Sequence, residues 1–211
     1  MTINMECELA KGLDQLNIVA SQVQQNQLLC LMQQLIKWNK TYNLTAIKDP
    51  AEVLTLHLMD SLAVIPFINQ KTILDVGTGA GFPGLPLAIM LPQTQFTLLD
   101  GNSKKIRFIR QQIHTLKLSN VEVMHSRVED AKGTQYQAII SRAFASMEDM
   151  VNLTRHLLAK GGMWLAMRGR YSGLESATLK TLVNEVKVHQ LKVPGLDAQR
   201  CLVLLELINK N

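Results

Sequence analysis

The sequence lacks several features that define other classes of protein. It contains three cysteines, Cys7, Cys30 and Cys201, which form neither a CxxC pair nor a metal-ligand spacing. A disulfide framework and a zinc site are therefore not expected. The scattered cysteines fit reduced thiols in a cytoplasmic protein.

Long apolar runs are absent as well. Polar residues interrupt every hydrophobic stretch, and none reaches the roughly 20 residues needed to cross a bilayer. Residues 1–11 carry Glu6 and Glu8 and no apolar core segment, so no signal peptide is expected. Repeats and low-complexity tracts are also missing. With 211 residues, 47% of them hydrophobic, we expect one globular domain with a short extension.

The formal net charge of +5 is unevenly distributed along the chain. Residues 1–70 hold four Lys and Arg against six Asp and Glu, which gives −2, whereas residues 71–211 hold eighteen against eleven, which gives +7. A basic half fits a polyanionic partner, because neutralising phosphates releases counterions. It fits an ordinary basic surface equally well, and charge alone leaves both interpretations open.

The chain divides by texture into residues 1–70 and residues 71–211. In the first part, apolar residues at helical spacing predict an amphipathic helix over 21–39 that opens at Ser21. A second helix is predicted from Pro50 to Ile65, with the proline in its first turn. We therefore expect an N-terminal helical cap that packs on the rest of the chain.

From Thr72 onward, short apolar strands alternate with helices, which predicts a mostly parallel sheet covered on both faces. A turn at Pro194-Gly195 makes the last two strands a hairpin, so the last strand should run antiparallel. The fold class is thus α/β and Rossmann-like, with seven strands as in class I methyltransferases. The predicted strands are 72–76, 96–100, 121–125, 137–141, 163–167, 186–193 and 202–208. The predicted helices between them are 83–91, 103–118, 147–159 and 174–183.

The loop after the first predicted strand reads Asp75-Val76-Gly77-Thr78-Gly79-Ala80-Gly81 and precedes a helix. Glycines allow a tight turn and a close approach of the backbone to a ligand. Asp100 ends the next strand, where a carboxylate accepts hydrogen bonds from ribose hydroxyls. The pattern predicts a nucleoside-containing cofactor, with Asp75, Gly77, Gly79, Gly81 and Asp100 in its site.

A dinucleotide enzyme is the competing interpretation, because Gly79 to Gly84 also satisfies GxGxxG. Two features favour S-adenosylmethionine instead. An acidic residue two places before the first glycine suits the amino group of a methionine moiety. Pro83 and Pro86 remove N–H groups from the helix start, where a pyrophosphate needs donors.

Longer strings resemble one family. In order, they are Trp38-Asn39-Lys40-Thr41-Tyr42-Asn43-Leu44-Thr45, His57-Leu58-Met59-Asp60-Ser61, Asp75 to Gly84, Ser126-Arg127-Val128-Glu129 and Ser141-Arg142-Ala143-Phe144-Ala145. From about residue 20 to the C-terminus, the chain closely resembles the bacterial 16S ribosomal RNA methyltransferase G family, also called glucose-inhibited division protein B. The segment Gly101-Asn102-Ser103-Lys104-Lys105 departs mildly from the family pattern.

The resemblance implies methyl transfer from S-adenosylmethionine to N7 of a guanine in the decoding-centre loop of 16S rRNA, as naked RNA or as a small-subunit ribonucleoprotein. By matching motif positions, it also implies that Gly77, Phe82, Val128, Glu129 and Arg142 surround the donor. N7 carries an in-plane lone pair and no proton, so its methylation needs positioning and electrostatics and no general base. The sequence contains no Asp/Asn-Pro-Pro-aromatic motif and no cysteine beside a proline, which is consistent with such a reaction.

Arginines and lysines are the candidates for contact with RNA. Arg142 follows the fourth predicted strand, at the edge where ligands bind in open α/β sheets, and Arg127 follows the third. We expect a catalytic role for Arg142 and, as second candidate, Arg127. Lys104, Lys105 and, more weakly, Arg200 are expected to contact the RNA backbone.

Three alternatives remain open from the residues alone: a methyltransferase for another RNA, a protein or a small molecule; a redox enzyme; and an RNA-binding module with a vestigial donor pocket. His57 and Asp60 lie one turn apart on the predicted second helix. We interpret them as a pair that braces the cap against the sheet, because a metal site needs a third ligand.

Overall fold

The computed structural model describes residues 4–173 and 177–208. Within these residues, seven strands form one sheet in the order β3-β2-β1-β4-β5-β7-β6. Neighbouring strands from β3 to β5 pair in parallel, whereas β7 runs antiparallel to both β5 and β6. The strands are β1 (Thr72–Val76), β2 (Gln95–Asp100), β3 (Val121–His125), β4 (Tyr136–Ser141), β5 (Leu158–Arg168), β6 (Val183–Leu191) and β7 (Arg200–Leu207). The predicted fold class is confirmed.

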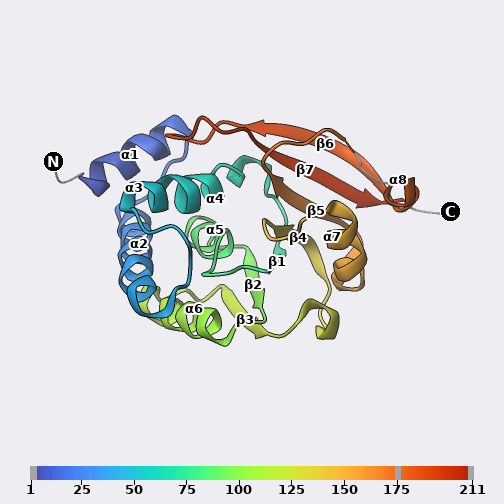
Figure 1. Cartoon of the computed structure of the whole chain (residues 1–211), viewed down its shortest axis with the longest axis horizontal. Coiled ribbons are helices and arrows are strands. Elements are labelled where there is room, and N and C mark those ends of the chain that lie inside the picture. The colour runs from blue at the N-terminus through green and yellow to red at the C-terminus, as the bar shows by residue number, and fades with distance from the viewer. Residues whose placement is uncertain (1–3, 174–176, 209–211) are drawn as a thin grey trace.

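Helices cover both faces of this sheet (Figure 1). Helices α2, α5 and α6 lie on one face and α7 on the other, while α1, α3 and α4 extend the first layer. The α-helices are α1 (Met5–Gln15), α2 (Gln22–Tyr42), α3 (Pro50–Glu52), α4 (Asp60–Leu62), α5 (Gly84–Met90), α6 (Ser103–Leu116), α7 (Met147–Thr154) and α8 (Ala177–Leu182). The shorter helical turns are η1 (Val53–Met59), η2 (Ile65–Phe67), η3 (Val128–Asp130) and η4 (Arg155–Leu157). No described helix is long and apolar enough to span a membrane.

Local sequence explains where the main helices begin. Ser21 caps α2 with a capping box, in which its hydroxyl accepts from the backbone N–H of Gln24 and the Gln24 side chain accepts from the N–H of Ser21. Asn102 caps α6 and Ser146 caps α7, each by accepting backbone N–H groups of the first turn. These caps place the start of α6 directly after the carboxyl end of β2.

The helical stretch predicted from Pro50 to Ile65 is present, but it is not one regular α-helix. Pro50 does open α3, but the chain then widens into the π-helix η1 before it resumes as α4. A π-helix turn is uncommon and is frequently found at functional sites. Here it contains His57 and leads directly into Asp60.

Several other boundaries differ from the sequence prediction. The helix predicted over 147–159 ends at Thr154, because Leu158 already begins β5 and pairs with Tyr136. The helix predicted over 174–183 partly falls on residues 174–176, which lie outside the described residues, and Val183 belongs to β6. Helix α1 was not predicted.

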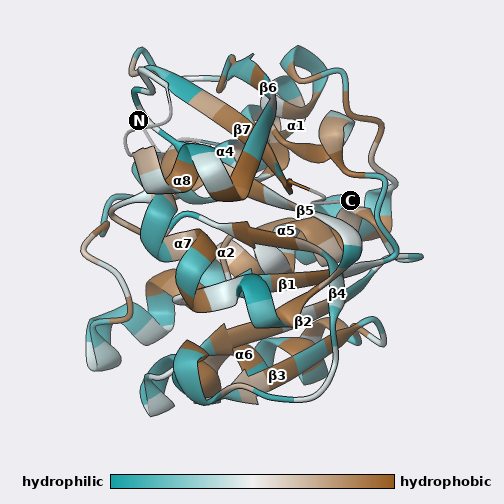
Figure 2. Ribbon diagram, turned by 90° about the vertical axis from the view of Figure 1, so that its right-hand side faces the viewer, coloured by the Kyte–Doolittle hydropathy of each residue, from teal (hydrophilic) through white to brown (hydrophobic). Residues whose placement is uncertain are grey.

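Two apolar clusters lie on opposite faces of the sheet. Along β5, Leu165 and Met167 belong to the cluster beneath α2, α5 and α6, whereas Trp164 and Ala166 belong to the cluster beneath α7. Because both faces are buried, the central strands are mainly apolar on both faces instead of alternating, as the brown colour that predominates in Figure 2 shows. Trp164 is fully buried, and its indole N–H donates to Thr154.

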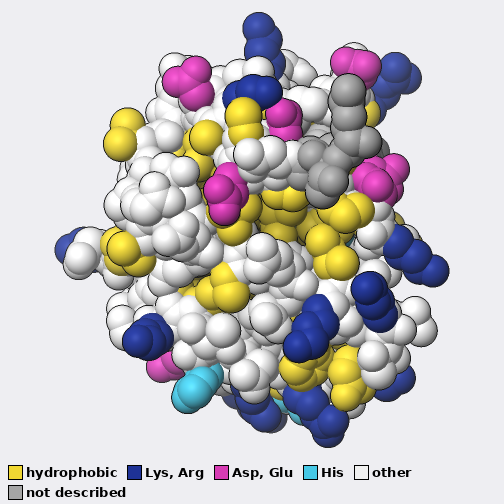
Figure 3. All heavy atoms as spheres, turned by 90° about the vertical axis from the view of Figure 1, so that its left-hand side faces the viewer, with side chains coloured by type: hydrophobic (Ala, Val, Ile, Leu, Met, Phe, Trp, Pro, Cys, Tyr) yellow, Lys and Arg dark blue, Asp and Glu magenta, His cyan; other side chains and the backbone are white. Residues whose placement is uncertain are grey.

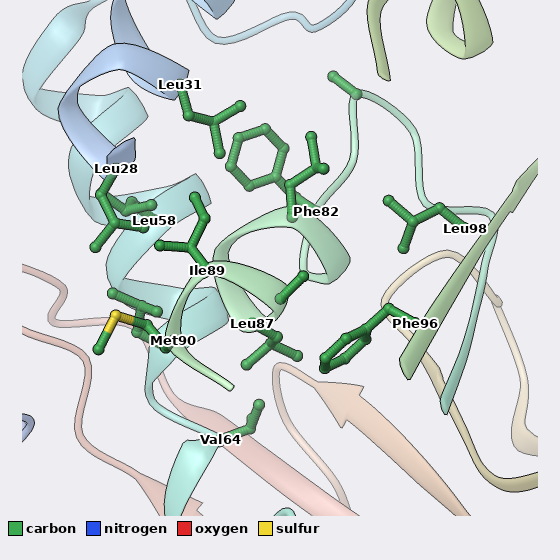
Figure 4. Packing of buried hydrophobic residues seen from close by; sticks show 14 of the residues in the cluster. Leu28, Leu31, Leu58, Val64, Phe82, Leu87, Ile89, Met90, Phe96 and Leu98 are labelled. Atoms are coloured by element: carbon green, nitrogen blue, oxygen red, sulfur yellow. The ribbon is translucent and has the colours of Figure 1, made fainter. Parts of the chain in front are cut away.

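The N-terminal helices share the first of these clusters with the sheet. Leu28 of α2 and Leu58 of η1 pack around Phe82 and Ile89, which belong to the glycine loop and to α5 (Figure 4). Residues 1–70 and 71–211 are therefore continuous in one apolar core. We expect them to unfold together.

Leu58→Ala should lower the free energy of unfolding by about 2–5 kcal/mol, because Leu58 is completely buried and its truncation leaves a cavity. Urea denaturation followed by circular dichroism and by tryptophan fluorescence measures this loss, and the two signals should give one coincident transition. Val19→Ala is the control, since Val19 is 97% exposed and should change stability by less than about 0.5 kcal/mol. Two separate transitions would contradict a shared core.

Candidate active site

The glycine loop turns sharply between β1 and α5. Gly77 has φ +68°, in the region that favours glycine, and a Cβ placed on it would lie 2.6 Å from the Cβ of Ala143. The N–H groups of Gly77 and Thr78 both donate to the carbonyl of Leu99, at 2.9 and 3.1 Å. The loop therefore lies against the end of β2, and it leaves no room for a side chain at Gly77.

The side chain of Asp75 fixes the conformation of this loop through hydrogen bonds. Its carboxylate is 1% exposed, and Oδ2 accepts from the hydroxyl of Thr78 at 2.6 Å and from the N–H of Gly84 at 2.8 Å. Burial raises the pKa of Asp75 to about 6, although these two hydrogen bonds act in the opposite direction. Oδ1 has no hydrogen-bond partner among the described residues. The buried Asp75 does not itself line the donor cavity described below, and its predicted role toward the methionine amino group stays a prediction.

Asp100 ends β2 on the other side of the loop. Its Oδ2 accepts from the N–H of Gly79 at 2.9 Å, and its Oδ1 accepts from the N–H of Asn102 at 2.8 Å. The ammonium of Lys105 lies 3.9 Å from Oδ2. An ionised carboxylate offers about four acceptor positions, so two remain for a diol such as a ribose.

A cavity of about 240 Å³ opens above the glycine loop. Gly77, Gly79, Phe82 and Arg142 line it, as predicted, together with His57. The ring of Phe82 is 4% exposed and stacks on the imidazole of His57, with 4.8 Å between their centroids. We call this the donor cavity.

A second cavity, of about 420 Å³, lies beside the first. Its charged side chains are Arg142, Arg168 and Arg200 together with Asp60, and its remaining walls are mainly apolar. His57 and Arg142 line both cavities, so the two spaces meet at these residues. We call this second space the arginine cavity.

The arginines come together because β7 runs antiparallel. Arg142 follows β4 and Arg168 ends β5, so both lie at the carboxyl edge of the parallel strands. Arg200 is the first residue of β7, and the antiparallel pairing of Arg168 with Cys201 brings it to the same edge. Arg200, the weaker candidate for contact with RNA, thus lies in the same cavity as Arg142, the first candidate for a catalytic role.

Asp60 joins two of these arginines. It is 4% exposed; Arg142 Nη1 donates to its Oδ2 at 2.8 Å, and Arg200 Nε lies 3.2 Å from its Oδ1. Arg142 Nη1 also donates to the carbonyl of Leu56 at 3.0 Å. The predicted bracing of the N-terminal helices against the sheet by Asp60 is therefore confirmed.

His57 is held neutral at the boundary between the cavities. Burial, and secondarily the guanidinium of Arg142, lower the pKa of His57 to about 4. Its Nδ1 lies 3.5 Å from Arg142 Nη2 and its Nε2 lies 2.9 Å from the hydroxyl of Thr45. Since an arginine only donates, the neutral ring accepts at Nδ1 and donates from Nε2.

Other predicted residues lie elsewhere. Arg127 is exposed and lies against Gly101 beyond Asp100, and it lines neither cavity. Val128 is buried with the cluster beneath α7, and Glu129 is exposed in the same turn. Arg127, the second candidate for a catalytic role, therefore lies apart from Arg142, with the glycine loop between the ends of β3 and β4.

Three further residues that the sequence singled out, Gly81, Lys104 and Lys105, differ in what surrounds them. A Cβ at Gly81 would lie 2.4 Å from Leu85, so this glycine serves packing under the loop. Lys104 is exposed on α6, whereas the partly buried Lys105 faces Asp100. The two lysines, which were expected to bind RNA together, therefore have different surroundings.

Sequence reasoning missed several lining residues: Leu44, Thr45, Thr78, Ala80 and Ala143 at the donor cavity, and Arg168 at the arginine cavity. Most lie inside the family-like strings, but their types carry no chemistry that singles them out. Arg168 had one usable signal, its place at the carboxyl end of β5.

Solved structures show the same fold. A SAM dependent methyltransferase from Aquifex aeolicus superposes with a TM-score of 0.56 at 18% identity, covering 74% of this chain and 93% of its own. The N-methyltransferase NodS from Bradyrhizobium japonicum WM9, in complex with S-adenosyl-L-homocysteine, gives 0.55 at 16% identity, covering 82% and 98%. The strand order and the glycine loop define a Rossmann-like fold, which these S-adenosylmethionine-dependent enzymes share.

Sequence relatives make the assignment more specific. The family described as rRNA small subunit methyltransferase G matches residues 24–203. Ribosomal RNA small subunit methyltransferase G of Ectopseudomonas mendocina (strain ymp) is 49% identical over 201 residues, 94% of each chain. That of Idiomarina loihiensis is 46% identical over 200 residues, 94% of this chain and 97% of its own. The chain belongs to the rRNA small subunit methyltransferase G family.

Gly77→Ala should lower the affinity for S-adenosylmethionine at least about tenfold, because the new Cβ meets Ala143 and the backbone is strained at φ +68°. Isothermal titration calorimetry measures the affinity. Gly133→Ala is the matched control, since Gly133 has φ +104°, no atom lies within 4 Å of the place its Cβ would take, and it lines neither cavity. It should lose stability without losing affinity. Equal affinity in Gly77→Ala and the wild type would contradict the placement of the donor.

His57 should make the fold less stable in acid. Its pKa is about 4 in the folded protein and about 6.5 when unfolded, so below pH 6.5 the unfolded chain binds a proton that the folded chain does not. The wild type should therefore lose up to about 1.4 kcal/mol per pH unit between pH 6 and 4.5 relative to His57→Gln. Urea denaturation across this range measures the difference. Parallel stability curves would show that His57 is not held neutral.

Proposed function

We propose that this protein transfers the methyl group of S-adenosylmethionine to N7 of a guanine in the decoding-centre loop of 16S rRNA. The single observation that carries the proposal is the meeting of the donor cavity and the arginine cavity at His57 and Arg142. A donor above the glycine loop and a nucleotide among arginines would face each other there. The substrate is the rRNA itself or a small-subunit ribonucleoprotein, and the enzyme works in the cytoplasm where that RNA is found.

The residues around the glycine loop fit the donor. Gly77 packs against Ala143 without a side chain and both line the donor cavity, and Asp100 retains acceptors for the ribose hydroxyls. The unpartnered Oδ1 of Asp75 adds negative charge beneath the loop, which favours the ammonium of the methionine part above it. Phe82 closes the cavity beside His57 and excludes water.

The chemistry required of the protein is small. Bound S-adenosylmethionine supplies a methyl group that its sulfonium already activates. N7 of guanine presents a lone pair and no proton, so no residue has to remove one. A neutral His57 is consistent with this, because it adds no positive charge next to a base that becomes cationic.

Arg142 is the residue that orients the acceptor. Its guanidinium keeps its charge at every physiological pH and can donate to O6 of guanine or to a phosphate. A cation placed directly at N7 would oppose the developing positive charge, so we assign Arg142 to O6, a phosphate or the donor carboxylate. Asp60 and the carbonyl of Leu56 hold it in place.

The RNA backbone would continue over α6. This helix contains Lys104, Arg107 and Arg110 and no acidic residue, and a cavity of about 410 Å³ lies between Arg107, Arg110 and His125. Lys and Arg side chains gather on the lower part of the face in Figure 3, at the height of α6 in Figure 1. Lys104 belongs to this surface, whereas the ammonium of Lys105 lies near the carboxylate of Asp100.

The product tests the proposal. Incubation with labelled S-adenosylmethionine and 16S rRNA from cells that lack the enzyme should yield 7-methylguanine at one site, detected by borohydride and aniline cleavage. Arg142→Ala should slow the transfer at least about tenfold, which corresponds to about 1.4 kcal/mol of barrier. Arg155→Ala, an exposed arginine that lines neither cavity, should transfer at the wild-type rate. Label in another base, in protein or in a small molecule would overturn the assignment.

A further inference from the structure

The arrangement of Asp60 goes beyond bracing the helices. A carboxylate that only joined two layers would need one cation, yet Asp60 faces two, Arg142 from the end of β4 and Arg200 from the start of β7. Pairing through β5 brings Arg142 and Arg200 to the same edge of the sheet, but β4 and β7 do not pair directly with each other. The shared carboxylate links the two side chains across β5.

The two guanidinium groups are only partly used by the protein. In the described part of the chain, Arg200 Nε lies 3.2 Å from Asp60 Oδ1 as an ion-pair contact, and Nη1 donates to the carbonyl of Gln199, which leaves one N–H of Nη1 and both N–H groups of Nη2. Arg142 uses Nη1 for Leu56 and Asp60 and approaches His57 with Nη2, which leaves Nε and one N–H of Nη2. Both side chains line the arginine cavity.

The charges of this group do not cancel. Two guanidinium groups share one carboxylate, and the neutral His57 adds nothing, so one positive charge remains. A pair of planar guanidinium forks with free N–H groups and one excess charge is suited to a monoanion with several acceptor oxygens. A phosphodiester of RNA is such an anion.

We propose that Asp60 is a positioning residue that holds Arg142 and Arg200 as a pair, so that together they bind one phosphate of the acceptor strand next to the target base. This proposal rests on the proposed RNA substrate. Asp60 itself does not touch the RNA. It restricts two long side chains that would otherwise have to be ordered each time RNA binds.

The direction in which one substitution changes RNA affinity distinguishes a positioning role of Asp60 from an effect of its charge alone. Asp60→Asn removes a negative charge from a basic cavity, so charge alone predicts tighter RNA binding and a steeper dependence on salt. Positioning predicts the opposite, because the two arginines lose their common partner. We expect Asp60→Asn to weaken binding of a 16S rRNA fragment about tenfold in fluorescence anisotropy and to raise KM by a similar factor, with affinity for S-adenosylhomocysteine within twofold of the wild type.

Asp197→Asn is the matched control, since it removes the same charge from the exposed loop before β7, outside both cavities. It should bind RNA as the wild type does or slightly more tightly. Asp60→Asn that binds RNA as tightly as this control, with unchanged KM, would overturn the proposal. Donor affinity and circular dichroism report whether the variant has folded.

Arg200→Lys tests the same idea without altering Asp60. Lysine keeps the charge but lacks the fork, so positioning predicts an affinity loss similar to that of Asp60→Asn and charge predicts none. In the double variant, the two losses should not add, because both act through one pair. Unchanged RNA binding by Arg200→Lys, or strictly additive losses, would overturn the proposal. A wild-type enzyme that leaves guanine N7 of 16S rRNA unmethylated would refute the proposed function instead, whatever these binding data show.

Discussion

The hydrogen bonds of one buried carboxylate, that of Asp75, set the shape of the active site. By accepting from Thr78 and from the N–H of Gly84, Asp75 ties the end of β1 to the start of α5 and thereby defines the turn between them. This arrangement is costly, because the side chain is removed from water and its pKa rises to about 6. The turn brings Gly77 against Ala143 and Gly79 against Asp100, so the floor of the donor cavity depends on it.

The direction of β7 determines which charged residues lie in the arginine cavity, next to the donor cavity. A parallel last strand would end, and not begin, at the carboxyl edge of the sheet, and Arg200 would lie at the opposite edge. The antiparallel pairing with β5 instead places Arg200 near Arg168 and within reach of Asp60. The same topology that completes the sheet therefore gathers positive charge next to the donor cavity.

Residues 1–70 contribute side chains to the two cavities and do not only cover the sheet. Their π-helix supplies His57 and the carbonyl of Leu56, and the turn that follows supplies Asp60. Burial and the facing guanidinium of Arg142 both lower the pKa of His57 and keep it neutral, so positive charge is limited where methylation of N7 would create more. The helices therefore adjust the electrostatics of the cavities while they bury the apolar face of the sheet.

The sequence by itself determined the order and type of most elements, the glycine loop, the acid at the end of β2 and the family. These features are local: apolar periodicity, turn residues and short motifs lie within one segment of chain, and each has one dominant physical interpretation. The antiparallel last strand was also predictable, because a single turn at Pro194-Gly195 leaves no room for a crossover helix.

Only the tertiary structure decided which polar residues act together. Arg142 and, as the second candidate, Arg127 were both singled out because each follows a strand, but strand order places the ends of β4 and β3 on opposite sides of the glycine loop. Asp60 and Arg200 are 140 residues apart, and no local pattern reports that their side chains meet at 3.2 Å. The π-helix was equally hidden, because no local pattern in residues 53–59 distinguishes it from an α-helix. Partners distant in sequence are chosen by the packing of the whole chain, which is why their pairing could not be read from any one segment.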